Sequence, residues 1–239
     1  MSALKRFFVD KIEEVTELCG EEFEHAKNVL RLGVGAEVVL LDNSGKEYTA
    51  VVAAVEKKRM LLNVVRTEVG QREAVTDVCL LFGYLKNADK NEFIVQKAVE
   101  LGVKKIGVFS SDFSSAYMNA NKLERLNKVS KEAAKQCLRS FAPEIVYYDT
   151  LDKALDAALD YKNKLFACEF ATGSDVEIGA LCGDTAIVIG SEGGFSREEA
   201  ERAKEKGFAH VSLGKRILRA ETAAISLTAV VAFALGEWQ

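Results

Sequence analysis

The 239-residue sequence has few of the residues that mark metal sites, disulfide-rich folds or disordered linkers. It contains one proline, two histidines and five cysteines, and no two cysteines form a Cys-x-x-Cys pair. We therefore expect no metal site and no disulfide framework. Scattered cysteines are typical of proteins that stay in a reducing environment, which predicts a cytoplasmic location.

Long apolar runs are also missing from the sequence. The most apolar segment, residues 223–235, is too short to span a bilayer and predicts a buried helix. The first residues lack the apolar stretch of a secretory signal. These features predict a protein that does not associate with a membrane.

The charges are distributed unevenly along the chain. The net charge of −4 by itself disfavours binding to nucleic acid. Residues 85–142, however, hold 11 Lys and Arg against 6 Asp and Glu, whereas residues 143–196 hold 3 against 10. A chain polarised in this way can present one basic face to RNA. A solvated helical surface with chance clustering is the alternative interpretation.

Two parts of the sequence differ in their periodicity. Strand-like segments at 37–41, 47–52 and 60–65, with a helical turn at 22–30, predict a small barrel or meander. Further on, strand-like and helical segments alternate, which predicts a parallel sheet flanked by helices. These strands are expected at 78–82, 106–109, 145–148, 165–168, 186–189 and 210–213, and the helices at 91–101, 123–140, 151–159, 197–206 and 220–234. We expect the boundary between 68 and 74, which gives domains of residues 1–72 and 73–239.

The clearest local motif is the segment 187–196, Ile-Val-Ile-Gly-Ser-Glu-Gly-Gly-Phe-Ser. A buried strand ends there in a glycine-rich turn, and Ser196 with Glu199 forms the sequence pattern of a capping box that begins a helix. Glycines at this place let the backbone approach a ligand beyond the carboxyl end of a strand. A structural turn without a ligand is the alternative, because neither a dinucleotide fingerprint nor a P-loop is present.

A second motif, residues 213–223, leads from a strand through Gly214 into an apolar helix. Arg219 and Glu221 stand at the start of that helix, where an arginine can meet a phosphate and a glutamate interacts favourably with the helix dipole. A capped helix with a surface ion pair is the alternative. That alternative does not explain Ile217 and Leu218, two apolar residues in a connection.

Basic residues form the candidate RNA contacts. Lys128, Lys131, Lys135 and Arg139 are spaced to form one stripe of a helix, and Lys86 follows a strand at the expected ligand edge of the sheet. A solvated helical face is again the alternative. The candidate RNA-binding residues are Arg6, His25, Arg31, Lys86, Lys131, Lys135 and Arg139.

Together these segments resemble the bacterial small-subunit (16S) ribosomal RNA uridine-N3 methyltransferases of the SPOUT superfamily. The resemblance covers nearly the whole chain and is most specific at residues 190–194 and 213–223. It implies an α/β fold, with a trefoil-knotted C-terminal methyltransferase domain after a small N-terminal PUA-like β-barrel. It also implies a homodimer that acts on ribosomal RNA or the small ribosomal subunit, with the C-terminal apolar helix partly in the interface.

The same resemblance implies S-adenosylmethionine as the cofactor, bound by three loops of the C-terminal domain. The backbone of Gly190, Gly194 and Leu218 would hold adenine and ribose, with Ile217 as an apolar wall. The residues assigned to the cofactor are Cys168, Glu169, Ile189, Gly190, Gly193, Gly194, Leu213, Gly214, Ile217, Leu218 and Thr222.

The implied reaction is in-line attack of uridine N3 on the sulfonium methyl group. Glu192 is the candidate for taking the N3 proton, and Arg219 for stabilising the uridine anion or holding a phosphate. Two positions depart from the family pattern: Ser191 stands where proline is usual, and Phe113 where arginine is frequent. Two other functions stay open, namely methylation of another RNA and non-catalytic RNA binding.

Overall fold

The computed structural model describes residues 4–170 and 173–238, which divide into two compact units. The first unit comprises residues 1–73 together with 134–142, and the second comprises 74–133 with 143–239. The short segment 134–142 therefore belongs to the first unit although it lies about 60 residues further along the chain than residue 73. In the described part of the chain, no helix is long and apolar enough to cross a membrane.

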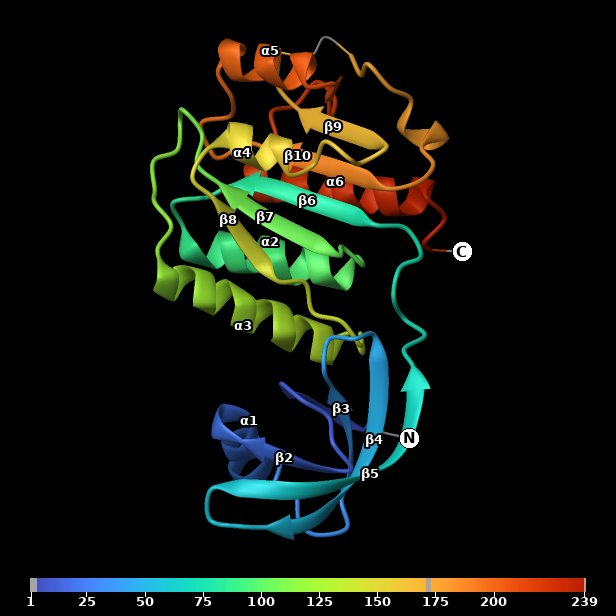
Figure 1. Ribbon diagram of the computed structural model, residues 1–239. Coiled ribbons are helices and arrows are strands. Elements are labelled where there is room, and N and C mark those ends of the chain that lie inside the picture. The colour runs from blue at the N-terminus through green and yellow to red at the C-terminus, as the bar shows by residue number, and fades with distance from the viewer. Residues whose placement is uncertain (1–3, 171–172, 239) are drawn as a thin grey trace. The chain divides into compact units, whose positions relative to one another are not determined.

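The first unit is built on a five-stranded sheet with the order β1-β3-β4-β5-β2 (Figure 1). β1 pairs with β3 in parallel, and the other pairs are antiparallel. The bounds are β1 Lys5–Phe8, β2 Val15–Cys19, β3 Glu37–Leu41, β4 Lys46–Val55 and β5 Arg59–Val69. The three predicted strands are confirmed, and two short strands before them were not predicted.

A short helical segment covers this sheet. Helix α1 (Gly20–Glu24) continues directly into a π-helical turn at His25–Val29, in place of the single helical turn expected at 22–30. Its buried Phe23 joins Phe7, Leu18, Leu40 and Met60 in one apolar core. Burial of these alternating strand residues on one face is the main stabilisation of the unit.

The segment 134–142 is fixed to the first unit by paired polar contacts. Asn43, in the β3–β4 turn, donates to the Ala142 carbonyl at 2.9 Å and accepts from its N–H at 2.8 Å. Glu73 accepts hydrogen bonds from the guanidinium of Arg139 at 3.0 and 2.7 Å. The chain reaches this position because Leu138 adopts a positive φ of 64°, which ends the preceding helical geometry.

The second unit contains a six-stranded parallel sheet with the order β11-β9-β10-β6-β7-β8. The strands are β6 Val78–Gly83, β7 Lys105–Phe109, β8 Ile145–Tyr148, β9 Asn163–Ala167, β10 Thr185–Ile189 and β11 Ala209–Val211. The helices are α2 Ala88–Glu100, α3 Ala120–Gln136, α4 Leu151–Asp156, α5 Arg197–Glu205 and α6 Ala220–Ala234, with a 3-10 turn at Ile178–Ala180. The predicted alternation and parallel sheet are confirmed.

Helices cover both faces of this sheet (Figure 1). Helices α4 and α5 lie on one face, where Leu81, Phe166, Val188 and Phe195 share a buried apolar cluster with Leu155 of α4. Helices α2 and α6 pack together, and α6 contacts β6 and β10. The strand order changes direction between β6 and β10, and ligands of open parallel sheets bind at such points beyond the carboxyl ends of the strands.

Candidate active site

A cavity of about 800 Å³ lies where β9, β10 and β11 end. Its volume is in the range of pockets that hold nucleotide-sized ligands. The chain segments that form it are the ends of these strands, the connections that follow them, and the first turns of α2 and α6. The lining residues are Lys90, Ala167, Cys168, Glu169, Ile189, Gly190, Ser191, Glu192, Gly194, Phe195, Val211, Ser212, Leu213, Gly214, Lys215, Arg216, Ile217, Leu218, Arg219, Ala220, Glu221 and Ala223.

The glycine-rich turn after β10 folds back on itself tightly. Ser191 and Gly194 form an isolated antiparallel bridge, and the Gly194 N–H donates to the Ser191 carbonyl at 3.0 Å. A Cβ on Gly190 would lie 3.1 Å from the Gly194 backbone, so the turn leaves little room for a side chain. At Gly83, the last residue of β6, a Cβ would lie 2.5 Å from the Ser191 nitrogen. The turn is therefore packed backbone to backbone against the end of β6.

The helix that follows this turn begins with the predicted capping box. The Glu199 N–H donates to Ser196 Oγ at 3.1 Å, and the Ser196 N–H donates to the Glu199 carboxylate at 2.8 Å. The same two residues bind the loop after β7: Ser196 Oγ donates to Asp112 at 2.9 Å, and the Asp112 N–H donates to Glu199 at 2.9 Å. This network holds the loop after β7 beside the glycine-rich turn.

The position of Phe113 explains why residue 193 is a glycine. A Cβ on Gly193 would lie 2.6 Å from Phe113 Cβ, so the close approach of these two loops requires glycine. Gly193 itself is not among the residues that line the cavity, although the sequence assigned it to the cofactor. Its place in the structure is against Phe113, whose side chain is half-exposed.

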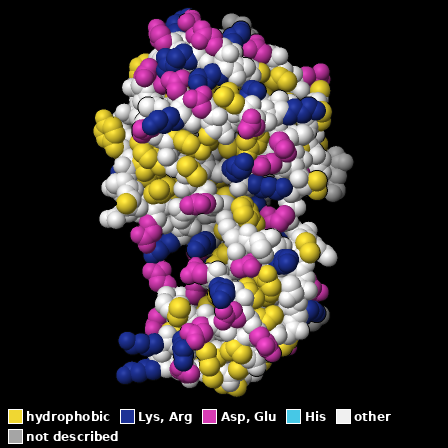
Figure 2. Space-filling view, viewed as in Figure 1, with side chains coloured by type: hydrophobic (Ala, Val, Ile, Leu, Met, Phe, Trp, Pro, Cys, Tyr) yellow, Lys and Arg dark blue, Asp and Glu magenta, His cyan; other side chains and the backbone are white. Residues whose placement is uncertain are grey.

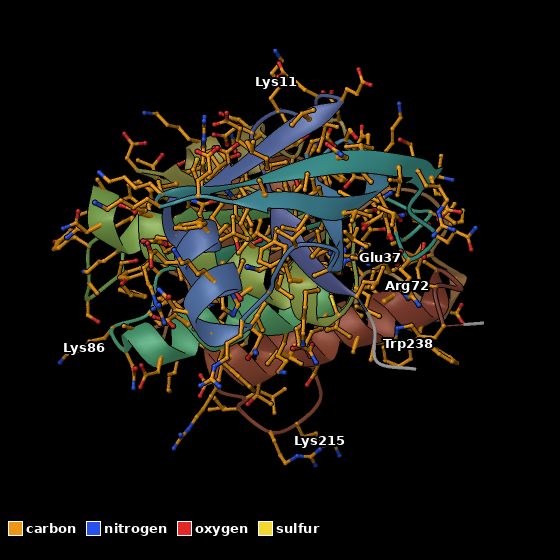
Figure 3. All side chains as sticks on the ribbon, turned by 90° about the horizontal axis from the view of Figure 1, so that it is seen from below. Lys11, Glu37, Arg72, Lys86, Lys215 and Trp238 are labelled. Atoms are coloured by element: carbon orange, nitrogen blue, oxygen red, sulfur yellow. The ribbon has the colours of Figure 1, made fainter. Side chains whose placement is uncertain are left out.

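The connection between β11 and α6 forms another wall of the cavity. Gly214 has a positive φ of 92°, which favours glycine, and Arg219 is the N-cap residue of α6. Ile217 lines the cavity but is 91% exposed, so it is an open apolar surface and not an enclosed wall. Lys215 points away from the ribbon on this loop, as Figure 3 shows.

An ion pair inside the cavity was not predicted. Lys90 Nζ of α2 lies 2.9 Å from Glu221 Oε1 in the first turn of α6, and both residues line the cavity. Burial acts to raise the pKa of Glu221, but hydrogen bonds from Lys90 and the backbone, with the charges of Lys90 and Arg219, lower it overall. The carboxylate is therefore ionised at neutral pH. In the sequence these two residues are 131 positions apart, and only the packing of α2 on α6 joins them.

Glu192 is exposed at the rim of the cavity and is held by the backbone of the loop after β6. Its Oε1 accepts a hydrogen bond from the Lys86 N–H at 3.0 Å. That loop is fixed in turn by buried Asn91, which donates to the Leu85 carbonyl and accepts from its N–H, both at 2.9 Å. The Lys86 side chain extends outward near the start of α2, as Figure 3 shows.

Most of the cofactor residues expected from the sequence come together in this one cavity. Gly193 and Thr222 do not line it. Those that do are Cys168, Glu169, Ile189, Gly190, Gly194, Leu213, Gly214, Ile217 and Leu218, together with the two candidate catalytic residues Arg219 and Glu192. The sequence predicts the position of Glu221 at the start of the helix correctly, but it assigns none of Ser191, Lys90 and Glu221 to the site.

The predicted basic stripe is wrong at its end. Helix α3 ends at Gln136 instead of continuing to Ser140, so Arg139 does not extend the helical face. Arg139 is 2% exposed and bound to Glu73, which leaves no surface for a phosphate. Lys128 and Lys131 are exposed, whereas Lys135 is largely buried and pairs with Glu22 at 3.0 Å.

The candidate RNA contacts of the first unit differ in exposure. Arg31 is exposed and has a positive φ of 54°. The Arg6 side chain is 7% exposed and pairs with Glu47 at 2.6 Å. The His25 ring packs edge-on against Phe7 with the ring centres 6.4 Å apart. Of these three residues, only Arg31 is exposed, whereas Arg6 and His25 are partly buried.

Two wider expectations concern charge and metal. Figure 2 shows Lys and Arg side chains interspersed with Asp and Glu on the face it displays, so the uneven charge along the sequence produces no face of one sign there. Within residues 4–170 and 173–238, no cluster of three or more His, Cys, Asp and Glu has the arrangement of a metal site.

Comparison with known families gives the class of protein. A model described as the RNA methyltransferase domain matches residues 72–232, and one described as the RNA methyltransferase PUA domain matches residues 18–72. The two matches together cover the chain from residue 18 to residue 232. The chain thus has the organisation of an RNA methyltransferase, with a PUA domain followed by an α/β unit that carries a cavity at the carboxyl edge of its parallel sheet.

Individual relatives narrow this class. The protein named ribosomal RNA small subunit methyltransferase E of Bacillus subtilis is 28% identical over 96% of both chains. The protein of the same name from Mesomycoplasma hyopneumoniae is 37% identical over 66% of this chain and 70% of its own. This chain belongs to the RNA methyltransferase family that contains these enzymes.

Two solved structures have the same fold and carry a cofactor. A protein of Legionella pneumophila described as a methyltransferase and solved with S-adenosylmethionine aligns with a TM-score of 0.88 and 29% identity over 98% of both chains. The ribosomal RNA small subunit methyltransferase E of Neisseria gonorrhoeae, bound to S-adenosyl methionine, aligns with a TM-score of 0.86 and 27% identity over 99% of this chain and 100% of its own.

Proposed function

We propose that this protein transfers a methyl group from S-adenosylmethionine to N3 of a specific uridine in 16S ribosomal RNA. The observation that carries the proposal is the cavity formed by the connections after β9, β10 and β11, in a chain whose relatives are solved with S-adenosylmethionine. The choice of uridine N3 rests on the resemblance of residues 190–194 and 213–223 to that enzyme family.

The residues of the cavity fit this cofactor. Gly190 and Gly194 bring backbone to the wall, where a nucleoside can be held by main-chain groups. Ser191 and Glu221 line the cavity, and the buried atoms Ser191 Oγ and Glu221 Oε2 have no hydrogen-bond partner among the described residues. A ligand with several hydroxyl, amino and carboxylate groups, such as S-adenosylmethionine, can satisfy atoms of this kind.

The chemistry of the transfer divides between cofactor and protein. When bound, S-adenosylmethionine supplies a methyl group on a positively charged sulfur. Glu192 at the rim accepts the N3 proton of the uridine, because its carboxylate is exposed to the substrate side and oriented by the Lys86 N–H. Arg219 at the start of α6 stabilises the negative charge that develops on the uracil oxygens.

The rest of the chain serves RNA recognition and assembly. We assign RNA binding to a PUA-like domain of residues 1–72 and methyl transfer to residues 73–239, in a knotted SPOUT arrangement. Exposed Arg31, Lys86 and Lys131 contact phosphates. The protein works as a cytoplasmic homodimer on the small subunit, with the apolar face of α6 at Val230 and Phe233, which are 50% and 60% exposed, in the interface.

Cofactor binding is the first test of this function. Calorimetry of the purified protein with S-adenosylhomocysteine is expected to give a dissociation constant in the micromolar range, which corresponds to a binding free energy on the order of −8 kcal/mol. Absence of binding would contradict the proposed methylation and favour the alternative, a non-catalytic RNA-binding protein. The variant Arg219→Ala is then expected to have no methylation activity on small subunits. It is expected to unfold at the same temperature as the protein without the substitution. Unchanged turnover would exclude Arg219 from the site.

A further inference from the structure

Ser191 is a buried polar residue without a partner at the wall of the cavity. It is 5% exposed, and its hydroxyl has no hydrogen-bond partner among residues 4–170 and 173–238. Buried hydroxyl groups in folded proteins are nearly always paired, because leaving one unpaired costs free energy. A group of this kind at the wall of a ligand cavity points to a hydrogen bond that a ligand completes.

The backbone at Ser191 is held firmly in place. The residue lies in the tight turn closed by its bridge to Gly194, and its nitrogen packs so closely on Gly83 that a Cβ there would lie 2.5 Å from it. Only rotation about χ1 remains to direct the hydroxyl, and a serine rotates among its three staggered positions at small cost. Because a hydroxyl both donates and accepts, it can pair with any polar group brought close to it.

We propose that the Ser191 hydroxyl forms a hydrogen bond with the bound adenosyl cofactor and so contributes to its affinity. This inference rests on the proposed function, because it takes the ligand of the cavity to be S-adenosylmethionine. It assigns to Ser191 a role in ligand affinity and none in the stability of the ligand-free fold.

The test compares ligand affinity with ligand-free stability for the same variant. S-Adenosylhomocysteine is titrated into the unmodified protein and Ser191→Ala by calorimetry, and each is unfolded with urea in the absence of ligand. We expect Ser191→Ala to weaken binding by about three- to tenfold, the effect of one hydrogen bond. The ligand-free protein is expected to be as stable as before or more stable, because an unpaired buried hydroxyl has been removed.

Thr228 provides a matched control. It is 1% exposed, its hydroxyl is likewise without a partner among the described residues, and it lies on α6 but is not part of the cavity wall. Thr228→Val removes that hydroxyl while keeping the shape of the side chain. Its ligand-free stability should be unchanged or raised, as in Ser191→Ala, while its affinity for S-adenosylhomocysteine should stay within twofold of the unmodified protein.

The outcomes separate this inference from the proposed function. If Ser191→Ala binds S-adenosylhomocysteine as tightly as the protein without substitutions, the proposed hydrogen bond is overturned, but the cofactor site stands. The hydrogen bond is also overturned if Ser191→Ala loses ligand-free stability in parallel with its affinity, because the residue would then act through the fold. No binding by the unmodified protein overturns the proposed function itself. If Ser191→Ala does not fold, Ser191→Cys keeps a side chain of similar size with a weaker donor and is expected to show the same direction of change.

Discussion

Glu73 makes an unusual number of contacts for one carboxylate, and its removal is predicted to destabilise the first unit strongly. Its Oε2 accepts from the Arg139 guanidinium, and its Oε1 accepts from the Ser140 N–H at 2.9 Å and the Phe141 N–H at 3.1 Å. Because Arg139 is 2% exposed, the variant Glu73→Ala would leave its positive charge buried without this carboxylate.

The expected cost of Glu73→Ala is about 3–5 kcal/mol of unfolding free energy, the loss that follows when one partner of a buried ion pair is removed. Glu73→Gln keeps an oxygen for the two backbone N–H groups and is expected to lose less. Glu68→Ala is the matched control, because the Arg66–Glu68 pair is exposed at both residues and contributes less than about 1 kcal/mol.

The assay has to report on the first unit. The single tryptophan, Trp238, belongs to the second unit, so its fluorescence would follow the wrong part of the chain. Hydrogen exchange of the Ser140 and Phe141 amides, read by mass spectrometry, reports directly on the contacts of Glu73. An Arg139→Ala variant of unchanged stability but reduced RNA affinity and reduced salt dependence would refute this reasoning, since Arg139 would then be a surface cation.

Further predictions concern Gly193, Cys79 and Glu221. Gly193→Ala is expected to displace the Phe113 loop and to lower methylation by tenfold or more, because the new Cβ would lie 2.6 Å from Phe113 Cβ; turnover within twofold of normal would contradict this. Burial, aided by the charge of Asp77, raises the pKa of the Cys79 thiol to about 12, so at pH 8 an alkylating reagent should modify exposed Cys182 and leave Cys79 intact, as peptide mass mapping can check. The contribution of Cys79 to stability is present below the unfolded thiol pKa and is lost as the pH rises from about 9 toward 12. Glu221→Gln should weaken S-adenosylhomocysteine binding measured by calorimetry, because it removes one of the carboxylates of the cavity wall and its pairing with Lys90; unchanged affinity would exclude Glu221 from the ligand contacts.

The parts of the fold that could be predicted have strong local signals. Strand Ile145–Tyr148 and helix Ala220–Ala234 have the bounds expected from the sequence, since a proline precedes the first and Gly214 with a long apolar periodicity marks the second. The capping box of Ser196 and Glu199 is equally local. The strands Lys5–Phe8 and Val15–Cys19 were missed because they are short and are defined by pairing with distant strands.

The candidate site likewise has parts that the sequence predicts and parts that depend on the folded structure. Glycine-rich connections after apolar strands are visible in the sequence, and the parallel sheet brings their ends together. The Lys90–Glu221 pair depends on α2 packing against α6, and no local pattern announces it. In the sequence, Arg139 has the spacing of a residue on the helical stripe. The helix ends at Gln136 and Leu138 has a positive φ, so Arg139 does not lie on the helix and the spacing does not place it on the stripe.

The most direct test of the central claim is mass spectrometry of nucleosides from small ribosomal subunits that lack this modification. The subunits are incubated with the purified protein and S-adenosylmethionine carrying a labelled methyl group, and their RNA is then digested to nucleosides. The labelled methyl group is predicted to appear as 3-methyluridine with the unmodified protein and to be absent with Arg219→Ala. Label in another nucleoside, or no label in RNA, would contradict the account.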